Sequence, residues 1–162
     1  PGNTFHAAVI VCSDTIAAGK KEDRAGKSVM QILEKYGVQK PIYRVVSDER
    51  LMIRNTLTEL LEQKIDLVLF TGGTGLSPRD ITPESIRDMI DREVPGIMEA
   101  ARQYGQQRMP FAMLSRGIAG FAGKTLIITL PGSTNGAIET MQALFPALFH
   151  IFKMAQGERH DA

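Results

Sequence analysis

Residues 71–84 read Thr-Gly-Gly-Thr-Gly-Leu-Ser-Pro-Arg-Asp-Ile-Thr-Pro-Glu, and this stretch limits the possible folds more than any other part of the chain. The apolar run before it, residues 65–70, has the length and composition of a buried parallel strand. Thr82, Pro83 and Glu84 at its end form a helix-starting signal. The sequence therefore predicts a buried strand, a glycine-rich loop and a helix in direct succession.

The glycines of this loop indicate an anion site. Gly72, Gly73 and Gly75 leave backbone N–H groups uncovered by side chains, and the nearby helix N-terminus adds partial positive charge, so a phosphate is the natural occupant. Asp80 would repel a phosphate unless a divalent cation lay between them, which favours a Mg²⁺-dependent phosphate reaction. The alternative role for Asp80 is a turn former that supports the next helix.

The size and charge of the chain narrow the class of protein. Its 162 residues, 43% of them hydrophobic, suffice for a single domain with a sizeable core. A formal charge of +1 favours a small partner over nucleic acid. The single Cys12 cannot form an internal disulfide, and the sequence shows no signal peptide and no apolar run long enough to span a bilayer. We therefore expect a soluble protein in a reducing compartment, with residues 157–162 as a polar tail.

Strand patterns alternate with helix patterns along the chain. Apolar or β-rich runs predict strands at 7–12, 42–46, 65–70 and 124–130. Helical spacing of apolar residues predicts helices at 29–36, 51–61, 82–90, 97–104 and 137–154, and residues 113–123 are short strands or loop. This alternation predicts an α/β fold, a three-layer sandwich with a mostly parallel sheet and helices on both faces.

In such a fold, ligands bind beyond the carboxyl ends of the strands. The loops that leave four predicted strands carry suitable residues: Ser13 with Asp14, Ser47 with Asp48, residues 72–80, and residues 131–133. Parallel strands would bring these loops to one edge of the sheet, where they would line a common pocket. The loop at 72–80 is neither a P-loop, because no Gly-Lys-Ser/Thr follows it, nor a dinucleotide fingerprint, because Pro78 replaces the third glycine.

The longer string at 71–84 is far more specific. It resembles the signature of the molybdopterin adenylyltransferase family, enzymes of molybdenum cofactor biosynthesis that include the G domain of gephyrin. One branch of that family lacks the Pro-Arg-Asp pattern, whereas this chain keeps Pro78, Arg79 and Asp80, as the active branch does. Further segments resemble family landmarks in the same order: 13–14, 22–26, 48–49, 91–96, 114–116, 123–128 and 130–133. The second glycine loop, at 132–136, and Ala25, where a serine is common, depart from the family pattern.

The resemblance implies a molybdopterin-binding-like fold and the transfer of AMP from ATP to the terminal phosphate of molybdopterin, with Mg²⁺ present and pyrophosphate released. It also implies a cytoplasmic homotrimer, with fusion to or contact with other molybdenum cofactor enzymes as an open alternative. Asp48 and Asp80 would be the catalytic carboxylates that hold Mg²⁺. The remaining contacts to phosphates and pterin would come from Ser13, Asp14, Gly72, Gly73, Thr74, Gly75, Ser77, Arg79, Pro131, Gly132 and Ser133.

Structural roles compete with several of these assignments. Asp48 lies in a helix-capping sequence, Ser13 and Asp14 lie in a strand-exit turn, and Arg79 is also explained as a solvated charge. Cys12 has the surroundings of an inert core thiol. The main alternative function is a catalytically silent module that binds molybdopterin or scaffolds a partner, and a nucleotide-binding regulatory domain is a third.

Overall fold

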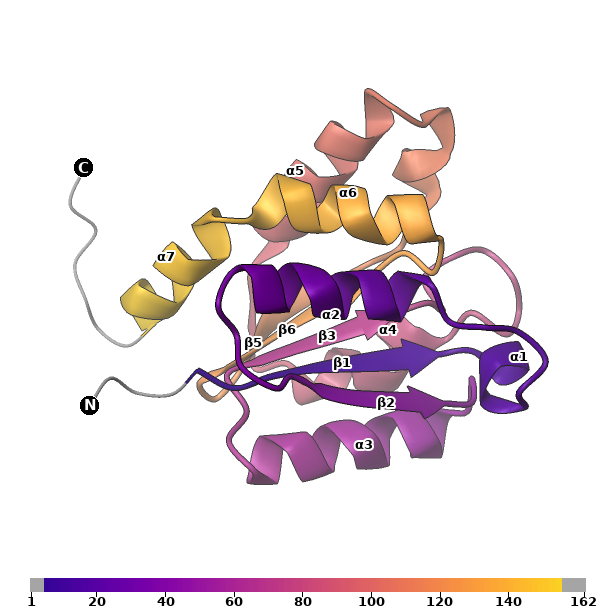
Figure 1. Cartoon of the computed structure of the whole chain (residues 1–162), viewed down its shortest axis with the longest axis horizontal. Coiled ribbons are helices and arrows are strands. Elements are labelled where there is room, and N and C mark those ends of the chain that lie inside the picture. The colour runs from indigo at the N-terminus through magenta and orange to yellow at the C-terminus, as the bar shows by residue number, and fades with distance from the viewer. Residues whose placement is uncertain (1–4, 156–162) are drawn as a thin grey trace.

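A six-stranded sheet forms the centre of the molecule, with strand order β2-β1-β3-β6-β5-β4. The computed structural model describes residues 5–155 (Figure 1). The strands are β1 (Ala7–Cys12), β2 (Ile42–Val46), β3 (Leu67–Thr71), β4 (Arg92–Glu93), β5 (Ala119–Ala122) and β6 (Thr125–Leu130). Strands β2, β1, β3 and β6 are parallel neighbours, while β5 and β4 join antiparallel at one end. The predicted mostly parallel sheet is confirmed.

Helices cover both faces of this sheet, which gives the three predicted layers (Figure 1). The α-helices are α1 (Asp14–Ala17), α2 (Ala25–Lys35), α3 (Arg50–Glu62), α4 (Thr82–Ile86), α5 (Pro95–Gln106), α6 (Thr134–Leu144) and α7 (Ala147–Ala155). Two 3₁₀ helices, η1 (Arg87–Met89) and η2 (Pro110–Leu114), complete the described elements. Helices α2, α5, α6 and α7 contribute to the core on one face, and α3 and α4 contribute to the core on the other.

The alternation of side chains along β1 explains this arrangement. Val9 packs in the cluster that contains Leu33 of α2, whereas the next residue, Ile10, packs in the opposite cluster with Leu57 of α3. Successive strand residues point to opposite faces, so a strand that is covered on both sides is apolar throughout. All six residues of β1 are buried, which is why the run 7–12 is continuous in sequence rather than alternating.

The predicted helix at 137–154 is wrong as a single element. Helix α6 ends at Leu144, and α7 begins at Ala147 after the Phe145–Pro146 bond. Pro146 has no N–H to donate, and it forces Phe145 into an extended conformation with ψ 144°. The apolar spacing continues through the break, so periodicity alone did not reveal it.

Other predicted elements differ at their ends. The helix that starts at Thr82 stops after Ile86 instead of continuing to residue 90, and η1 follows it. The turn at 13–15 is a short helix, α1, in which the hydroxyl of Ser13 accepts the N–H of Ile16. The helix predicted at 51–61 is α3, but Leu51, the first residue of that range, is 71% exposed. The predicted tail at 157–162 lies outside the described residues.

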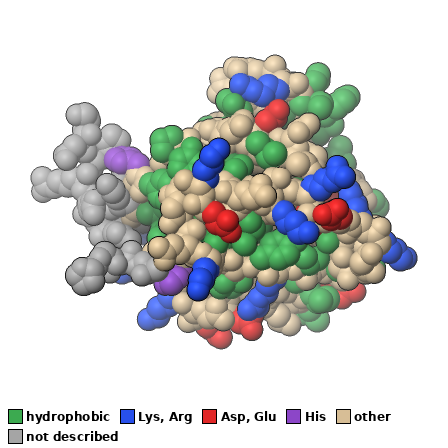
Figure 2. Space-filling model, viewed as in Figure 1, with side chains coloured by type: hydrophobic (Ala, Val, Ile, Leu, Met, Phe, Trp, Pro, Cys, Tyr) green, Lys and Arg blue, Asp and Glu red, His purple; other side chains and the backbone are tan. Residues whose placement is uncertain are grey.

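The visible surface mixes the two signs of charge. Figure 2 shows Lys and Arg side chains interspersed with Asp and Glu side chains across one face of the molecule. Within residues 5–155, no helix combines the length and the apolar composition needed to cross a membrane.

Candidate active site

The loops that leave the four parallel strands meet at one edge of the sheet, as the sequence predicted. The loops after β1 and β2 are joined by a reciprocal pair of hydrogen bonds. The N–H of Asp14 donates to the Asp48 carboxylate at 3.0 Å, and the N–H of Asp48 donates to the Asp14 carboxylate at 2.9 Å. Asp48 therefore braces the neighbouring loop. Helix α3 is capped at Glu49 without a side-chain bond, so the capping alternative for Asp48 is wrong.

The loops after β3 and β6 also lie against each other. The N–H of Gly72 donates to the carbonyl of Leu130 at 3.1 Å, and a Cβ on Gly132 would lie 3.2 Å from the Cα of Gly72. Gly72 has φ +92°, and a Cβ there would overlap the carbonyl oxygen of Cys12. Only glycine fits at this crossing. Because its N–H is already bonded, Gly72 anchors the loop, and within residues 5–155 the N–H groups of this loop without a hydrogen bond begin at Gly73.

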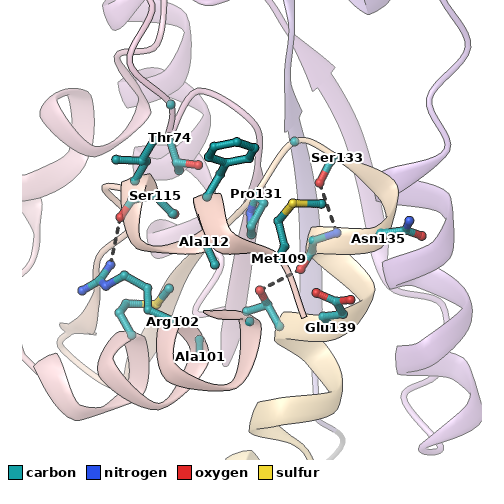
Figure 3. Close-up of a pocket in the computed structure, with 18 of the residues that line it drawn as sticks. Thr74, Ala101, Arg102, Met109, Ala112, Ser115, Pro131, Ser133, Asn135 and Glu139 are labelled. Carbon is teal, nitrogen blue, oxygen red and sulfur yellow. Dashed lines mark hydrogen bonds between the residues drawn. The ribbon is translucent and has the colours of Figure 1, made fainter. Parts of the chain in front are cut away.

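A cavity of about 750 Å³ opens beside these two glycine loops. Helix α5 and η2 form one side and the start of α6 forms the other. Figure 3 shows Ala101 and Arg102 on the first side and Asn135 and Glu139 on the second. The volume lies within the range of small-molecule sites, and apolar groups of Met109 and Ala112 line it together with polar ones. The seven predicted site residues in its wall are Gly73, Thr74, Gly75, Asp80, Pro131, Gly132 and Ser133.

The other predicted residues lie beside the cavity instead of in its wall. Arg79 turns toward Asp14, with its Nε and a terminal nitrogen 2.9 and 2.8 Å from one carboxylate oxygen. The N–H of Ser77 donates to the Asp80 carboxylate at 2.9 Å, so Asp80 braces its own loop while it lines the cavity. Ser133 caps α6 by accepting the N–H of Gly136 at 3.1 Å. The expected common pocket is thus formed by two of the four loops, with the Asp14 and Asp48 pair next to it.

The pKa values of Asp48 and Asp14 are shifted in opposite directions. Burial raises the pKa of Asp48, and the negative charges of Asp14 and Asp80 act in the same direction. One carboxylate oxygen of Asp48 is buried without a hydrogen-bond partner. The hydrogen bond from the N–H of Asp48, followed by the bond from Arg79, lowers the pKa of Asp14. Asp14 is therefore a satisfied anion, whereas Asp48 keeps one carboxylate oxygen without a hydrogen-bond partner in the described structure.

A divalent cation fits this pair of carboxylates. Mg²⁺ is commonly held by one or two carboxylates, with water and substrate phosphates completing its shell. Asp48 offers an unpartnered buried oxygen, and Asp80 lies within electrostatic range of it while facing the cavity. Among residues 5–155 there is no group of three or more His, Cys, Asp or Glu that would form a complete protein cage. The site therefore suits a metal that is shared with a phosphate ligand.

Sequence reasoning missed the arginines around the cavity. Arg102 and Arg108 come from α5 and the segment after it, and both line the wall. Arg116 lies behind the loop after β3, where it donates to the carbonyls of Gly75 and Asp80 at 2.8 and 2.7 Å. The only signal for Arg116 was its place in the family landmark at 114–116, which gave it no role. Arg102 and Arg108 carried no signal, because only the fold brings α5 beside the glycine loops.

Fold and site together define an α/β domain with a glycine loop, whose N–H groups lack hydrogen bonds in the described structure, beside a cavity at the carboxyl edge of its sheet. Residues 8–150 match the family described as "Probable molybdopterin binding domain", and the chain belongs to this family. It is 38% identical over 158 residues to a molybdopterin adenylyltransferase of Helicobacter pylori, covering 95% of this chain and 89% of that protein. The expected family and fold class are therefore confirmed.

Two further relatives extend the comparison. A molybdenum cofactor biosynthesis bifunctional protein of Chlorobaculum tepidum is 36% identical over 153 residues, covering 94% of this chain but only 49% of that protein. The chain thus spans about half the length of this bifunctional relative. The crystal structure of the molybdopterin biosynthesis enzyme MoaB from Thermus thermophilus superposes with a TM-score of 0.86 at 39% identity, covering 97% of this chain and 99% of that one.

Proposed function

We propose that this chain acts in molybdenum cofactor biosynthesis as a molybdopterin adenylyltransferase. In this reaction, an oxygen of the terminal phosphate of molybdopterin attacks the α-phosphorus of ATP. The new P–O bond gives adenylylated molybdopterin, and the bond to the β-phosphate breaks to release pyrophosphate. Family membership and the name of the Helicobacter pylori relative support the substrates, and the site supports the chemistry.

The observation that carries the proposal is the combination of free donors in the cavity wall with an unsatisfied acceptor beside the cavity. Gly73, Thr74 and Gly75 have backbone N–H groups without hydrogen bonds in the described structure and line the cavity. Asp48 has a buried oxygen without a partner, within electrostatic range of Asp80. A bare phosphate would satisfy the N–H groups but be repelled by the carboxylates. A phosphate with a divalent cation satisfies both.

The site residues have different proposed roles, which follow from where they lie. The N–H groups of Gly73, Thr74 and Gly75 would bind phosphate oxygens, and Asp48 and Asp80 would hold Mg²⁺. The metal supplies charge neutralisation for the phosphates when it is bound. Nucleotidyl transfer depends chiefly on positioning and charge neutralisation, so the chain needs no covalent nucleophile. This agrees with Cys12, where burial raises the pKa of the thiol to about 12 and keeps it inert.

The direct experiment incubates the protein with molybdopterin, ATP and Mg²⁺ and measures adenylylated pterin and pyrophosphate. We expect both products in equal amounts. Binding of molybdopterin without either product would favour the catalytically silent module, and tight ATP binding without pterin affinity would favour the regulatory domain. The homotrimer and the cytoplasmic location stay predictions, and sedimentation of the purified protein tests the first.

The variant Asp80→Asn tests the metal assignment within that reaction. The asparagine side chain keeps an oxygen that accepts the N–H of Ser77, so the loop is retained while the charge is lost. We expect turnover to be lost with molybdopterin affinity largely kept. Turnover equal to the wild type would remove Asp80 from the proposed metal site.

A further inference from the structure

Residues Ser115–Gly117 form a strap between α5 and the glycine loop after β3. On one side, Arg102 of α5 donates to the carbonyls of Ser115 and Gly117 at 3.3 and 3.1 Å; Figure 3 shows the bond to Ser115. On the other side, the backbone N–H of Arg116 donates to the carbonyl of Thr74 at 2.9 Å. The strap is therefore fixed on the scaffold at one side and bonded to the loop at the other.

The side chain of Arg116 adds three contacts to the same region. Its Nε donates to the carbonyl of Gly75 at 2.8 Å, and a terminal nitrogen donates to the carbonyl of Asp80 at 2.7 Å. The other terminal nitrogen pairs with the carboxylate of Glu84. The planar guanidinium can serve three acceptors in fixed directions, which an ammonium group cannot do. Arg116 thus ties both ends of the 75–80 loop and the start of α4 to one rigid group.

These bonds determine where the N–H groups of the loop point. In a trans peptide, the C=O of one residue and the N–H of the next point in opposite directions. The carbonyls of Gly73, Thr74 and Gly75 are all bonded, to Thr82 and to Arg116, and the loop has no cis bond. The next N–H groups along the chain, those of Thr74, Gly75 and Leu76, therefore point away from those partners.

The cavity lies on the side of the loop opposite these partners. Thr74, Gly75 and Leu76 line it, whereas Arg116 and Thr82 do not. We propose that Arg116 is a positioning residue that turns the N–H groups of Gly75 and Leu76 into the cavity, where they bind the phosphate oxygens of the nucleotide. Leu76 is thereby added as a donor that its side chain, 66% exposed, gave no reason to suspect. This inference rests on the proposed function for the identity of the ligand.

The test follows the loop directly by amide NMR of the whole protein titrated with pyrophosphate and Mg²⁺. We expect the amide protons of Gly75 and Leu76 to move downfield on binding in the wild type. In Arg116→Gln the shift of Leu76 should be lost, because the Gly75 carbonyl that orients its peptide is held by the Arg116 side chain. Gly75 should keep its shift, because the Thr74 carbonyl is held by the backbone N–H of residue 116, which glutamine retains. The affinity for pyrophosphate should fall by about 10- to 100-fold, because a charge-assisted hydrogen bond is removed. Arg116→Lys keeps the positive charge but not the three fixed directions, and should recover only part of that affinity.

Arg54→Gln is the matched control. Arg54 also donates to a backbone carbonyl, that of Ser85, and pairs with a carboxylate, that of Asp88, but it lies outside the cavity wall. We expect Arg54→Gln to bind pyrophosphate as the wild type does. An equal loss in Arg54→Gln and Arg116→Gln would reduce Arg116 to a general stabilising role and overturn the inference. Unmoved Gly75 and Leu76 amides in the wild type, or a full Leu76 shift in Arg116→Gln, would overturn it as well.

Turnover separates this inference from the proposed function. With molybdopterin and ATP, Arg116→Gln should raise the KM for ATP more than it lowers kcat, because the lost contacts hold the ground-state phosphates as well. A wild-type protein that binds pyrophosphate with the expected amide shifts but forms no adenylylated pterin would refute the proposed reaction and leave the role of Arg116 supported.

Discussion

Replacing Asp48 with asparagine should make the metal-free protein more stable while it abolishes the metal-dependent reaction. In the wild type, one oxygen of Asp48 accepts the N–H of Asp14, and the other is buried without a partner. Asparagine keeps an acceptor for Asp14 and removes the buried charge. A site that is prepared for a cation is expected to be strained when the cation is absent.

Asparagine leaves a neutral amide nitrogen where the unpartnered oxygen was, so the gain is the difference between an unsatisfied charged group and an unsatisfied neutral one. An unsatisfied neutral group costs about 1–3 kcal/mol and a charged one costs more. Asp48 is only half-buried, so we take that difference as small, about 1 kcal/mol. For a chain of this size, that corresponds to a rise in Tm of about 2–4 °C. Folding raises the pKa of Asp48, so its charge destabilises the fold only as pH rises through that pKa. The gain from Asp48→Asn should therefore be present at neutral pH and shrink toward acidic pH.

Thermal unfolding in the presence of a chelator measures this gain, and repetition with excess Mg²⁺ and pyrophosphate measures the lost metal site. Saturating ligand should raise the Tm of the wild type, by an amount equivalent to about 2.7 kcal/mol at a hundredfold its Kd, and should raise that of Asp48→Asn much less. Asp88→Asn is the control, because Asp88 is exposed and its pKa is lowered, chiefly by the hydrogen bond from Arg54. That variant should leave Tm unchanged or slightly lower. A fall in Tm for metal-free Asp48→Asn at neutral pH would refute the reasoning.

Three further predictions address the surroundings of the site. Gly72→Ala should lower the free energy of unfolding by at least about 2 kcal/mol in a denaturant titration, because the alanine combines positive φ with overlap on Cys12. Gly19→Ala is the control: Gly19 has φ +73° but open space around it, so this change should cost only about 1 kcal/mol. The thiol of Cys12 should resist alkylation at pH 8 until the protein is unfolded, and rapid labelling of the native protein would contradict its burial. Because folding raises the pKa of this thiol, its contribution to stability should be complete below pH 9 and should be lost as pH rises toward 12. Arg79→Ala should raise the pKa of Asp14 in a carboxyl NMR titration, but only in part, because the backbone N–H of the loop after β2 still donates to it; an unchanged pKa would show that the ion pair is absent in solution.

Apolar patterns in the sequence predicted those helices and strands that are buried in the same way along their whole length. The run 7–12 is buried on both faces, so its apolar composition identified β1 directly. The pattern failed where one residue changed the backbone without changing the apolar spacing. Pro146 separated α6 from α7 within a continuous apolar series. Leu51 is apolar but exposed, because it lies about 160° around α3 from the buried Ile53. Apolar spacing reports which face a residue occupies and not what covers that face.

The sequence by itself determined the glycine loops, the parallel sheet that brings them to one edge, and the family, because these depend on local backbone conformation and on a specific string at 71–84. Only the tertiary structure decided which groups are free to bind. One oxygen of Asp48 accepts the N–H of Asp14, at the start of α1 and 34 residues away in sequence, and in the described structure the other oxygen is buried without a partner. Arg116 directs the loop N–H groups from a strap some 41 residues further along the chain than Gly75. Such roles arise from contacts between distant segments, and no spacing within one segment records them.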